Sequence, residues 1–331
     1  MESSNKIAVI TGASSGIGMA TALEFARHGY HLVLAARRIK ELETVAVECR
    51  SYGVNALAVA VDTSDDQAVH QLGQVAEQTY GHVNVWVNSA AVYLTGKFQD
   101  QPLADMKRLM EVNFFGYVHG SHAALTLFRK QASGTLINVS SVNAKAPQPY
   151  VSIYSASKAA IKSLDESLRM ELYLEGLQDS IHVCTVMPAV TDTNFFQNGA
   201  NYTQRAVKAP EPVYDPEMVA RKIYHLTLAP KREIITGQSG RLMALQHATM
   251  PAQYEKQIAK YTEARLVDDD EPASDTQGNL YKPSANRGMR GGWSEQRTTN
   301  KEINTGLALS LAGLGALVGV GFWLIKRGER A

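Results

Sequence analysis

The sequence contains few cysteines and almost no net charge, and each shortage excludes a class of protein. Two cysteines in 331 residues are too few for a disulfide framework, and their spacing does not suit a metal. The 33 Lys and Arg residues nearly balance the 32 Asp and Glu residues, so charge gives no case for a nucleic-acid partner. The first apolar run already has the pattern of a strand, so we expect no N-terminal signal peptide.

Candidate metal ligands are also sparse. His119 and His122 lie close together on a predicted helix, but no third ligand is evident in the sequence. We therefore predict no metal site.

The chain opens with a strand, a glycine-rich turn and a helix. Residues 6–10 form an apolar run rich in β-branched side chains, typical of a buried strand, and residues 19–28 have a helical pattern. The turn between them, Thr11–Gly18, does not have the usual Gly-x-Gly-x-x-Gly spacing of dinucleotide-binding loops. Its glycines still let the main chain approach a phosphate, which the N–H groups and dipole of the helix would bind. The alternative is an ordinary tight turn.

Two features further along the chain carry side chains suited to proton transfer. The apolar run 136–139 predicts a strand that ends in Ser140 and Ser141, and open α/β sheets bind ligands at this end of their strands. Tyr154 and Lys158 are four residues apart, which places both on one face of a helix. A nearby ammonium lowers the pKa of a phenol from about 10, so the pair suits acid–base catalysis on an oxygen. The alternative is a chance spacing on a helix face.

Together these motifs resemble the classical short-chain dehydrogenase/reductase family over about residues 6–240. The motifs that carry the resemblance, in the family's order, are Thr11–Gly18, Asn113, Ser141 and the pair Tyr154-xxx-Lys158. The resemblance implies that Tyr154 is the general acid/base and that Lys158 lowers its pKa and binds the nicotinamide ribose. It also implies that Ser141 hydrogen-bonds the substrate oxygen and that Asn113 holds a water that relays protons to Lys158.

The resemblance further implies a set of coenzyme-binding residues. They are Gly12, Ser14, Ser15, Gly16, Ile17, Gly18, Arg37, Arg38, Asp62, Asn88, Tyr154, Lys158 and Thr193. Asp62, at the end of the third predicted strand, stands where the family has an adenine contact.

Two positions depart from the family's pattern. The family's Asn-Asn-Ala-Gly stretch is Asn88–Ala91 here, and its Pro-Gly after the sixth strand is Pro188–Ala189. Each change replaces a glycine by an alanine, whose Cβ we expect to cost some coenzyme affinity or to shift the nicotinamide slightly. Neither change touches a proton-transfer group, so we still expect an active enzyme.

The second predicted strand indicates which coenzyme binds. Residues 31–36 end in Arg37 and Arg38, and Ala36 stands where an acidic residue would select NAD. The forked donors and charge of a guanidinium suit the 2′-phosphate of NADP. We therefore predict NADP(H) as the coenzyme; the alternative is a solvated basic pair at the start of a surface helix.

The order of the elements predicts an α/β fold, a doubly wound parallel sheet of the Rossmann type. After the first strand, apolar runs recur at residues 32–35, 56–61, 83–87, 136–139, 181–187 and 233–235. Helical stretches separate most of these runs, which implies a parallel sheet with helices on both faces. We predict a single catalytic domain over residues 1–266.

Within this domain the pattern loosens after Thr191. The family resemblance implies that residues from about 193 to 212 form a lid over the substrate. Phe195 and Phe196 in this segment either line an apolar pocket or pack the lid itself.

Beyond the catalytic domain the composition changes to that of a linker. Residues 268–271 are acidic, and the stretch up to Asn304 is rich in Pro, Gly, Ser, Asn and Arg, with too few apolar groups to fold alone. We predict a flexible linker over residues 267–304. Residues 287–293 resemble an RNA-binding tract only vaguely, and a tether is the better explanation.

The end of the chain has the pattern of a membrane anchor. Gly306–Ile325 carries no charge and, at about twenty residues, is long enough to span a bilayer. Trp323 lies near one end, and a basic tail, residues 326–331, follows. We predict a transmembrane helix over residues 305–325, with the catalytic domain in the cytoplasm, where NADPH is found. A buried core helix or an oligomer-facing tail is the alternative.

Two functions of different classes follow from these patterns. The first is a membrane-tethered NADP-dependent enzyme acting on a small carbonyl or alcohol substrate that is apolar or lipid-like. The second is a membrane-tethered NADP(H)-binding scaffold or sensor without turnover. The complete set of Asn113, Ser141, Tyr154 and Lys158 favours the enzyme, which we expect to form a homo-oligomer.

Overall fold

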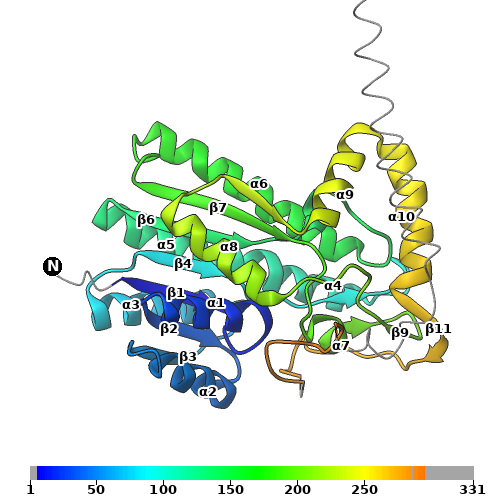
Figure 1. Cartoon of the computed structure of the whole chain (residues 1–331), viewed down its shortest axis with the longest axis horizontal. Helices are drawn as coiled ribbons and strands as arrows, with labels where there is room; N and C mark the ends of the chain where they lie inside the picture. The colour runs from blue at the N-terminus through cyan, green and yellow to red at the C-terminus, as the bar shows by residue number, and fades with distance from the viewer. Residues whose placement is uncertain (1–5, 285, 295–331) are drawn as a thin grey trace, which may run out of the picture. The chain divides into compact units, whose positions relative to one another are not determined.

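In the computed structural model, which describes residues 6–284 and 286–294, the part of the chain up to Gly291 is an α/β unit built on one parallel sheet. Seven of its strands lie in the order β10-β7-β6-β4-β1-β2-β3 (Figure 1). These are β1 (Ile7–Thr11), β2 (His31–Ala36), β3 (Ala56–Ala60), β4 (Val85–Asn88), β6 (Gly134–Val139), β7 (Ile181–Pro188) and β10 (Glu233–Thr236). The predicted fold class and all seven predicted strands are confirmed for this unit.

Helices connect these strands and cover both faces of the sheet. The main helices are α1 (Gly16–Arg27), α2 (Ile39–Arg50), α3 (Asp66–Tyr80), α4 (Leu103–Met110), α5 (Gly116–Gln131), α6 (Ser152–Leu174), α8 (Pro216–Leu228), α9 (Gln238–Thr249) and α10 (Pro251–Arg265). Every strand pair in the large sheet is parallel, as such helical crossovers require.

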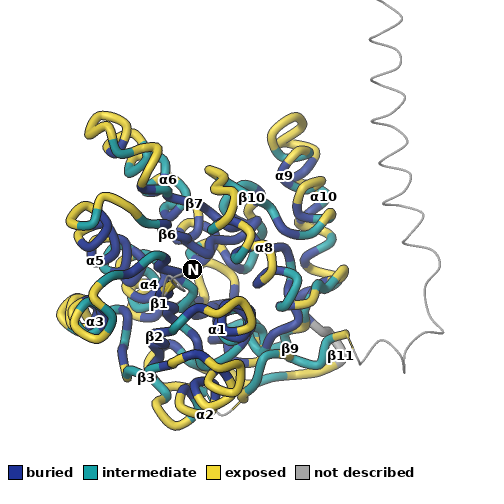
Figure 2. Tube along the Cα trace, turned by 60° about the vertical axis from the view of Figure 1, so that its left-hand side comes forward, coloured by how far each residue is buried: buried dark blue, intermediate teal, exposed yellow. Residues whose placement is uncertain are grey.

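Residues of the central strands belong to two separate cores. In Figure 2 the central strands of the sheet are largely buried. One core contains Ile10 and Leu34 from the strands and packs against α1, α2 and α8. The other contains Val9 and Trp86 and packs against α3, α5 and α6. Because both faces of the central strands are buried, these strands are mostly apolar, which is why the sequence shows them as apolar runs.

The functional edge of this sheet is set by its topology. Chain order reverses at β1, since β2 and β3 lie on one side of it and β4, β6, β7 and β10 on the other. Ligands of open α/β sheets bind beyond the carboxyl ends of the strands at such a switch point. The glycine-rich turn after β1 and Ser141 after β6 both lie at this edge.

Short elements cover this edge. The predicted lid segment contains α7 (Phe195–Asn198), β8 (Ala200–Asn201) and β9 (Arg205–Val207), and β8 pairs with β5 (Leu94–Thr95). Phe195 and Phe196 pack against a third core that also contains Tyr93 and Tyr154.

The stretch predicted as a linker starts differently in the structure. Residues Val267–Pro272 form β11, which pairs antiparallel with β9, and the chain then runs along the body of the unit to Gly291. Leu280 is completely buried in this part, and the Thr276 and Asn201 backbones hydrogen-bond to each other. The low apolar content predicted a tether, but one leucine and a series of backbone hydrogen bonds are enough to hold the segment in place.

The predicted transmembrane helix over residues 305–325 and the basic tail lie outside the described residues. Within residues 6–284 and 286–294, no helix is long and apolar enough to cross a bilayer.

Candidate active site

Three of the predicted catalytic side chains come together at the edge of the sheet. Ser141 follows β6, while Tyr154 and Lys158 lie one turn apart near the start of α6. All three are buried, with Ser141 8%, Tyr154 7% and Lys158 1% exposed. Such burial of a phenol and an ammonium carries a cost unless their polar atoms find partners.

The partner of the Tyr154 phenol is the Ser141 hydroxyl. Burial raises the pKa of Tyr154 to about 12, and the hydrogen bond with Ser141 lowers that pKa in part. The Ser141 hydroxyl is itself oriented by the backbone N–H of Asn143, which donates to its Oγ at 3.2 Å. The two hydroxyls therefore form a pair that is aimed by the turn after β6.

The Lys158 ammonium is held by β6 and by Tyr117. Its Nζ donates to the Val139 carbonyl at 3.1 Å and to the Tyr117 hydroxyl at 3.4 Å, and it lies 4.6 Å from the centre of the Tyr117 ring. Burial lowers the pKa of Lys158 to about 7. Lys158 Nζ lies 5.8 Å from the Tyr154 ring centre, and the expectation that Lys158 lowers the pKa of Tyr154 stays a prediction.

Asn113 lies in an irregular turn between α4 and α5. Residues Glu111–Phe115 form a π-helix, a feature that is frequent at functional sites. The Asn113 side chain accepts from the Val92 N–H at 2.8 Å and donates to the Val92 carbonyl at 2.9 Å. These two bonds use the side chain to fix the loop after β4, and the role of Asn113 in a proton relay stays a prediction.

Aromatic rings enclose the phenol of Tyr154. Tyr93 lies 5.2 Å and Phe195 5.7 Å from Tyr154, measured between ring centres, and Phe196 lies 5.4 Å from Tyr93. These contacts place the predicted lid segment directly against Tyr154. The Tyr154 ring is thus bordered by other aromatic rings.

The glycine-rich turn has the backbone that a phosphate cradle needs. Gly12 and Gly16 both have positive φ angles, 70° and 54°, which L side chains rarely adopt. A Cβ on Gly18 would lie 2.3 Å from the Gly12 carbonyl oxygen, and one on Gly16 would lie 3.3 Å from Thr193. Only glycines allow α1 to begin this close to β1, with its N–H groups at the edge of the sheet.

The two arginines after β2 point to this turn and to the C-terminal part of the unit. Arg38 Nη2 lies 3.5 Å from Ser14 Oγ, and Arg38 Nη1 donates to the Ser284 carbonyl at 3.1 Å and the Asn286 carbonyl at 3.2 Å. Arg37 Nη2 donates to the Asn279 carbonyl at 2.8 Å. Burial lowers the pKa of Arg37.

Two predicted coenzyme-binding residues have their side chains engaged elsewhere in the protein. Asp62 accepts from Arg108 at 2.8 Å and from the backbone and hydroxyl of Ser64. Asn88 is 1% exposed, accepts from Trp86 Nε1 at 2.9 Å and donates to Asn138 at 2.8 Å. Asn88 therefore shapes the site from within the protein, whereas the Asp62 side chain is 35% exposed and its contact with the adenine stays a prediction.

The Asn88 amide belongs to a buried polar network that sequence patterns did not reveal. Asn138 donates to Asp165 Oδ1 at 2.6 Å, and Thr185 donates to Asp165 Oδ2 at 2.6 Å. Asp165 is fully buried, which raises its pKa to about 7. The network links β4, β6, β7 and α6 directly behind the catalytic residues.

One of the two departures from the family's pattern is accommodated by neighbouring glycines. A Cβ on Gly237 would lie 2.9 Å from the Ala189 Cβ, and one on Gly240 would lie 3.2 Å from it. The methyl group of Ala189 thus points to these two glycines, which leave room for it. The structure gives no corresponding account of Ala91.

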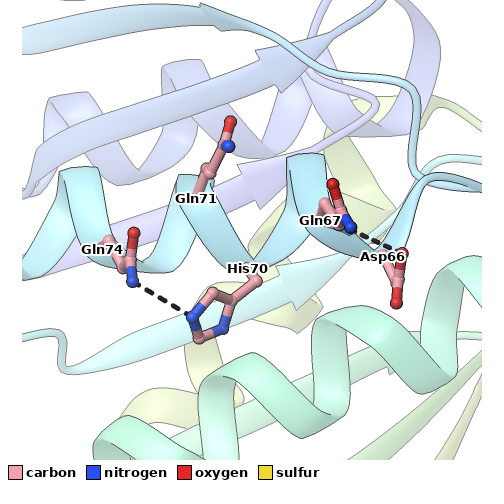
Figure 3. Close-up of a pocket in the computed structure, with 5 residues that line it drawn as sticks. All are labelled: Asp66, Gln67, His70, Gln71 and Gln74. Atoms are coloured by element: carbon pink, nitrogen blue, oxygen red, sulfur yellow. Dashed lines mark hydrogen bonds between the residues drawn. The ribbon is translucent and has the colours of Figure 1, made fainter.

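A shallow hollow on α3 is unrelated to this site. Its volume is about 410 Å³, and five exposed side chains of one helix border it: Asp66, Gln67, His70, Gln71 and Gln74 (Figure 3). Among the described residues, no group of three or more His, Cys, Asp or Glu side chains is arranged to hold a metal ion.

Comparisons with known proteins agree with this geometry. The family described as short chain dehydrogenase matches residues 6–202. YxnA, an oxidoreductase of Bacillus subtilis, is 33% identical over 249 residues, which cover 75% of this chain and 69% of YxnA. SA2266, an oxidoreductase of Staphylococcus aureus, is 31% identical over 227 residues, which cover 69% of this chain and 93% of SA2266.

Two solved structures share the fold and carry different coenzymes. An alcohol dehydrogenase of Thermococcus sibiricus, complexed with 5-hydroxy-NADP, aligns with a TM-score of 0.60 and 25% identity, over 70% of this chain and 95% of that one. A short chain dehydrogenase/reductase of Burkholderia phymatum, in complex with NAD, aligns with a TM-score of 0.68 and 26% identity, over 83% of this chain and 99% of that one. The glycine turn, the buried Ser141–Tyr154–Lys158 group and these relatives together establish that the chain belongs to the short-chain dehydrogenase/reductase family of oxidoreductases.

Proposed function

We propose that the protein is an NADP(H)-dependent enzyme that interconverts an apolar carbonyl compound and its alcohol. The observation that carries this proposal is the burial of Ser141, Tyr154 and Lys158 side by side at the sheet edge that also holds the glycine turn. The family membership supports oxidoreductase chemistry, and the residues present at the edge fit a dinucleotide.

The catalytic roles follow from the chemistry of the side chains. When bound, the nicotinamide coenzyme supplies or accepts the hydride. Ser141 and Tyr154 present two hydroxyls that can hydrogen-bond one substrate oxygen, and Tyr154 gives its phenolic proton to that oxygen in reduction and takes it back in oxidation. A protonated Lys158 favours the phenolate that remains, because it is buried in the same low-dielectric region.

The aromatic surroundings of Tyr154 support an apolar substrate. Tyr93 and Phe195 lie against the Tyr154 ring, and Phe196 packs against both of them. An extended apolar chain or ring system beside the carbonyl would bury its surface there, at about 25 cal/mol per Å² of apolar area.

Arg37 and Arg38 support NADP(H) over NAD(H). Arg38 lies against Ser14 in the glycine turn, so its guanidinium and the Ser14 hydroxyl form two neighbouring donors at the adenosine end of the predicted site. The solved relatives include complexes with an NADP analogue and with NAD, so the arginines carry this part of the proposal.

A scaffold without turnover is the weaker alternative. Such a protein has no need for a serine and a tyrosine hydroxyl beside a buried lysine. Ser141, Tyr154 and Lys158 are nevertheless all present and buried, and Ser141 hydrogen-bonds Tyr154.

NADPH oxidation in the presence of long-chain and cyclic aldehydes and ketones tests the proposed function. We expect turnover that rises with the apolar surface of the carbonyl compound and is faster with NADPH than with NADH. A protein that binds NADPH but turns over no carbonyl or alcohol across this series would favour the scaffold.

We further propose that residues 305–325 anchor the enzyme in a membrane, with the catalytic domain in the cytoplasm and a second copy as partner. The support is the uncharged run Gly306–Ile325 and the basic residues after it. Deleting residues from Asn304 onward should move the protein from the membrane pellet to the supernatant in a fractionation. Full-length protein that stays in the supernatant without detergent would refute the anchor.

A further inference from the structure

The part of the chain after β11 lies on the donors of the proposed coenzyme site. We use the term strap for residues 276–291, of which residue 285 lies outside the described residues. The Gly16 N–H, at the start of α1, donates to the Gly288 carbonyl at 3.2 Å. Arg37 and Arg38 donate to strap carbonyls as well, at Asn279, Ser284 and Asn286.

In these contacts, strap carbonyl oxygens accept hydrogen bonds from groups that we expect to donate to the phosphate oxygens of a dinucleotide. A backbone N–H such as that of Gly16 has one proton to donate, so a carbonyl that accepts it competes with a phosphate oxygen. The carbonyls on Arg38 likewise present partial negative charge beside Ser14, where a 2′-phosphate would be repelled by them. The strap carbonyls and the phosphate oxygens therefore compete for the Gly16 N–H and the Arg38 guanidinium.

The two halves of the strap are attached with different strength. The inner half, residues 276–281, has a fully buried Leu280, and Tyr281 and Gln277 both donate to the buried carboxylate of Asp105. Leu280 and the Asp105 carboxylate are buried, and Gln277 and Tyr281 reach that carboxylate from the surface, so this half is held to α4.

The outer half, residues 284–291, is attached mainly at the surface. Arg290 forms ion pairs with Asp215 at 2.9 Å and Glu217 at 3.3 Å, and Asn194 donates to the Arg287 carbonyl at 2.8 Å. Met289 packs only partly buried against the core. Gly288 has a φ of 95° and open space around it, so the backbone can turn there at little cost.

We propose that the outer half of the strap is an internal competitor of the coenzyme: its carbonyls hold Gly16 and Arg38 until the phosphates of the dinucleotide displace them, while the inner half stays bound. The proposal rests on the proposed function, because it assumes that these donors bind NADP(H). It makes coenzyme affinity depend on contacts that lie outside the coenzyme site.

The first test loosens the strap without touching a coenzyme-binding residue. Arg290→Ala removes the ion pairs with Asp215 and Glu217 and leaves the Arg287–Glu41 pair of the outer half in place. Arg129→Ala is a matched control that removes an equally exposed Arg–Glu pair between α5 and Glu175. We expect Arg290→Ala to bind NADPH about two- to fivefold more tightly in a fluorescence titration, the range that loss of weak surface ion pairs allows. The control should leave the affinity unchanged. An Arg290→Ala protein with unchanged or weaker NADPH affinity would overturn the proposal.

The second test measures the strap itself. Backbone hydrogen exchange in residues 286–291 should become faster when wild-type protein is saturated with NADPH, whereas residues 276–281 should exchange as before. Slower or unchanged exchange in the outer half would overturn the proposal and show that the strap forms a wall of the loaded site. Such a result would leave the proposed function standing, whereas a protein that binds neither NADPH nor NADH would contradict the proposed function and the competitor with it.

Discussion

The catalytic centre and the rim of the coenzyme site lie at the same edge of the sheet but are held together differently. Ser141, Tyr154 and Lys158 take their partners from β6, α5 and α6, which share one interior. Arg38 and Gly16 instead contact carbonyls of a segment that arrives from beyond residue 272. The Ser141–Tyr154–Lys158 group is thus fixed by the core, whereas Arg38 and Gly16 contact a strap that we propose to control coenzyme access.

The largest effect is expected at the catalytic centre. Tyr154→Phe removes only the hydroxyl that titrates, so the turnover of an established substrate should fall by at least about 10²-fold, the lower limit for general acid–base catalysis. NADPH affinity should stay within about twofold, as the ring still packs against Tyr93 and Phe195. Steady-state kinetics and a coenzyme titration measure the two quantities.

Tyr93→Phe serves as the control for this variant. Tyr93 contacts the Tyr154 ring from the edge and is equally buried, but it lies outside the proton-transfer group. Its variant should keep turnover within about tenfold of the wild type. Near-normal turnover in Tyr154→Phe would refute the role assigned to that hydroxyl.

An intermediate effect is expected at the rim. Arg38→Ala should weaken NADPH binding by roughly tenfold to a hundredfold, the range for losing charge-assisted hydrogen bonds. NADH binding should stay equal or become slightly tighter, because Arg38 also holds the strap carbonyls of Ser284 and Asn286. Titration of both coenzymes checks this difference.

Arg37→Ala sharpens the same comparison. Arg37 donates to the Asn279 and Leu280 carbonyls of the inner strap. Arg37→Ala should therefore reduce the preference for NADPH over NADH less than Arg38→Ala does. A wild-type protein that prefers NADH would overturn the coenzyme assignment altogether.

The sequence was sufficient for the sheet and for the catalytic group because both are encoded locally. Parallel strands buried on both faces appear as continuous apolar runs, and Tyr154 and Lys158 are neighbours on a single helix turn. The glycine turn is equally local, since its positive φ angles require the residues that the pattern shows.

The strap and the buried network could not be found in this way. The strap is held largely by its backbone carbonyls, which every residue type carries, and Leu280 and Met289 mark its contacts with the apolar cores. The network joins Asn138, Asp165 and Thr185 from three separate elements, and one carboxylate on a helix gives no sign of its partners. Tyr117, the neighbour of Lys158, was missed for the same reason.

The last expected effect is on the stability of the fold, not on activity or coenzyme binding, and concerns the pH dependence of that network. Burial raises the pKa of Asp165 to about 7 from its ordinary value of 3.8. Between these two values the folded protein keeps a proton that the unfolded chain has lost. The stabilisation from this proton is therefore fully present below about pH 4 and is lost as the pH rises through 7.

Asp165→Asn removes the titration and keeps the shape of the side chain. Its carbonyl oxygen can still accept from Asn138, and the Thr185 hydroxyl can turn to accept from the new amide. Relative to the wild type, the variant should gain up to a few kcal/mol of unfolding free energy between about pH 5 and pH 8, since each pKa unit corresponds to about 1.4 kcal/mol. Urea denaturation at both pH values measures this difference.

Asp66→Asn, at an exposed carboxylate on α3, controls for the change in net charge. The opposite result is an unfolding free energy of Asp165→Asn that runs parallel to that of the wild type from pH 5 to pH 8. That result would show that Asp165 is already ionised in the folded protein, where its two hydrogen bonds and Arg169 stabilise the carboxylate.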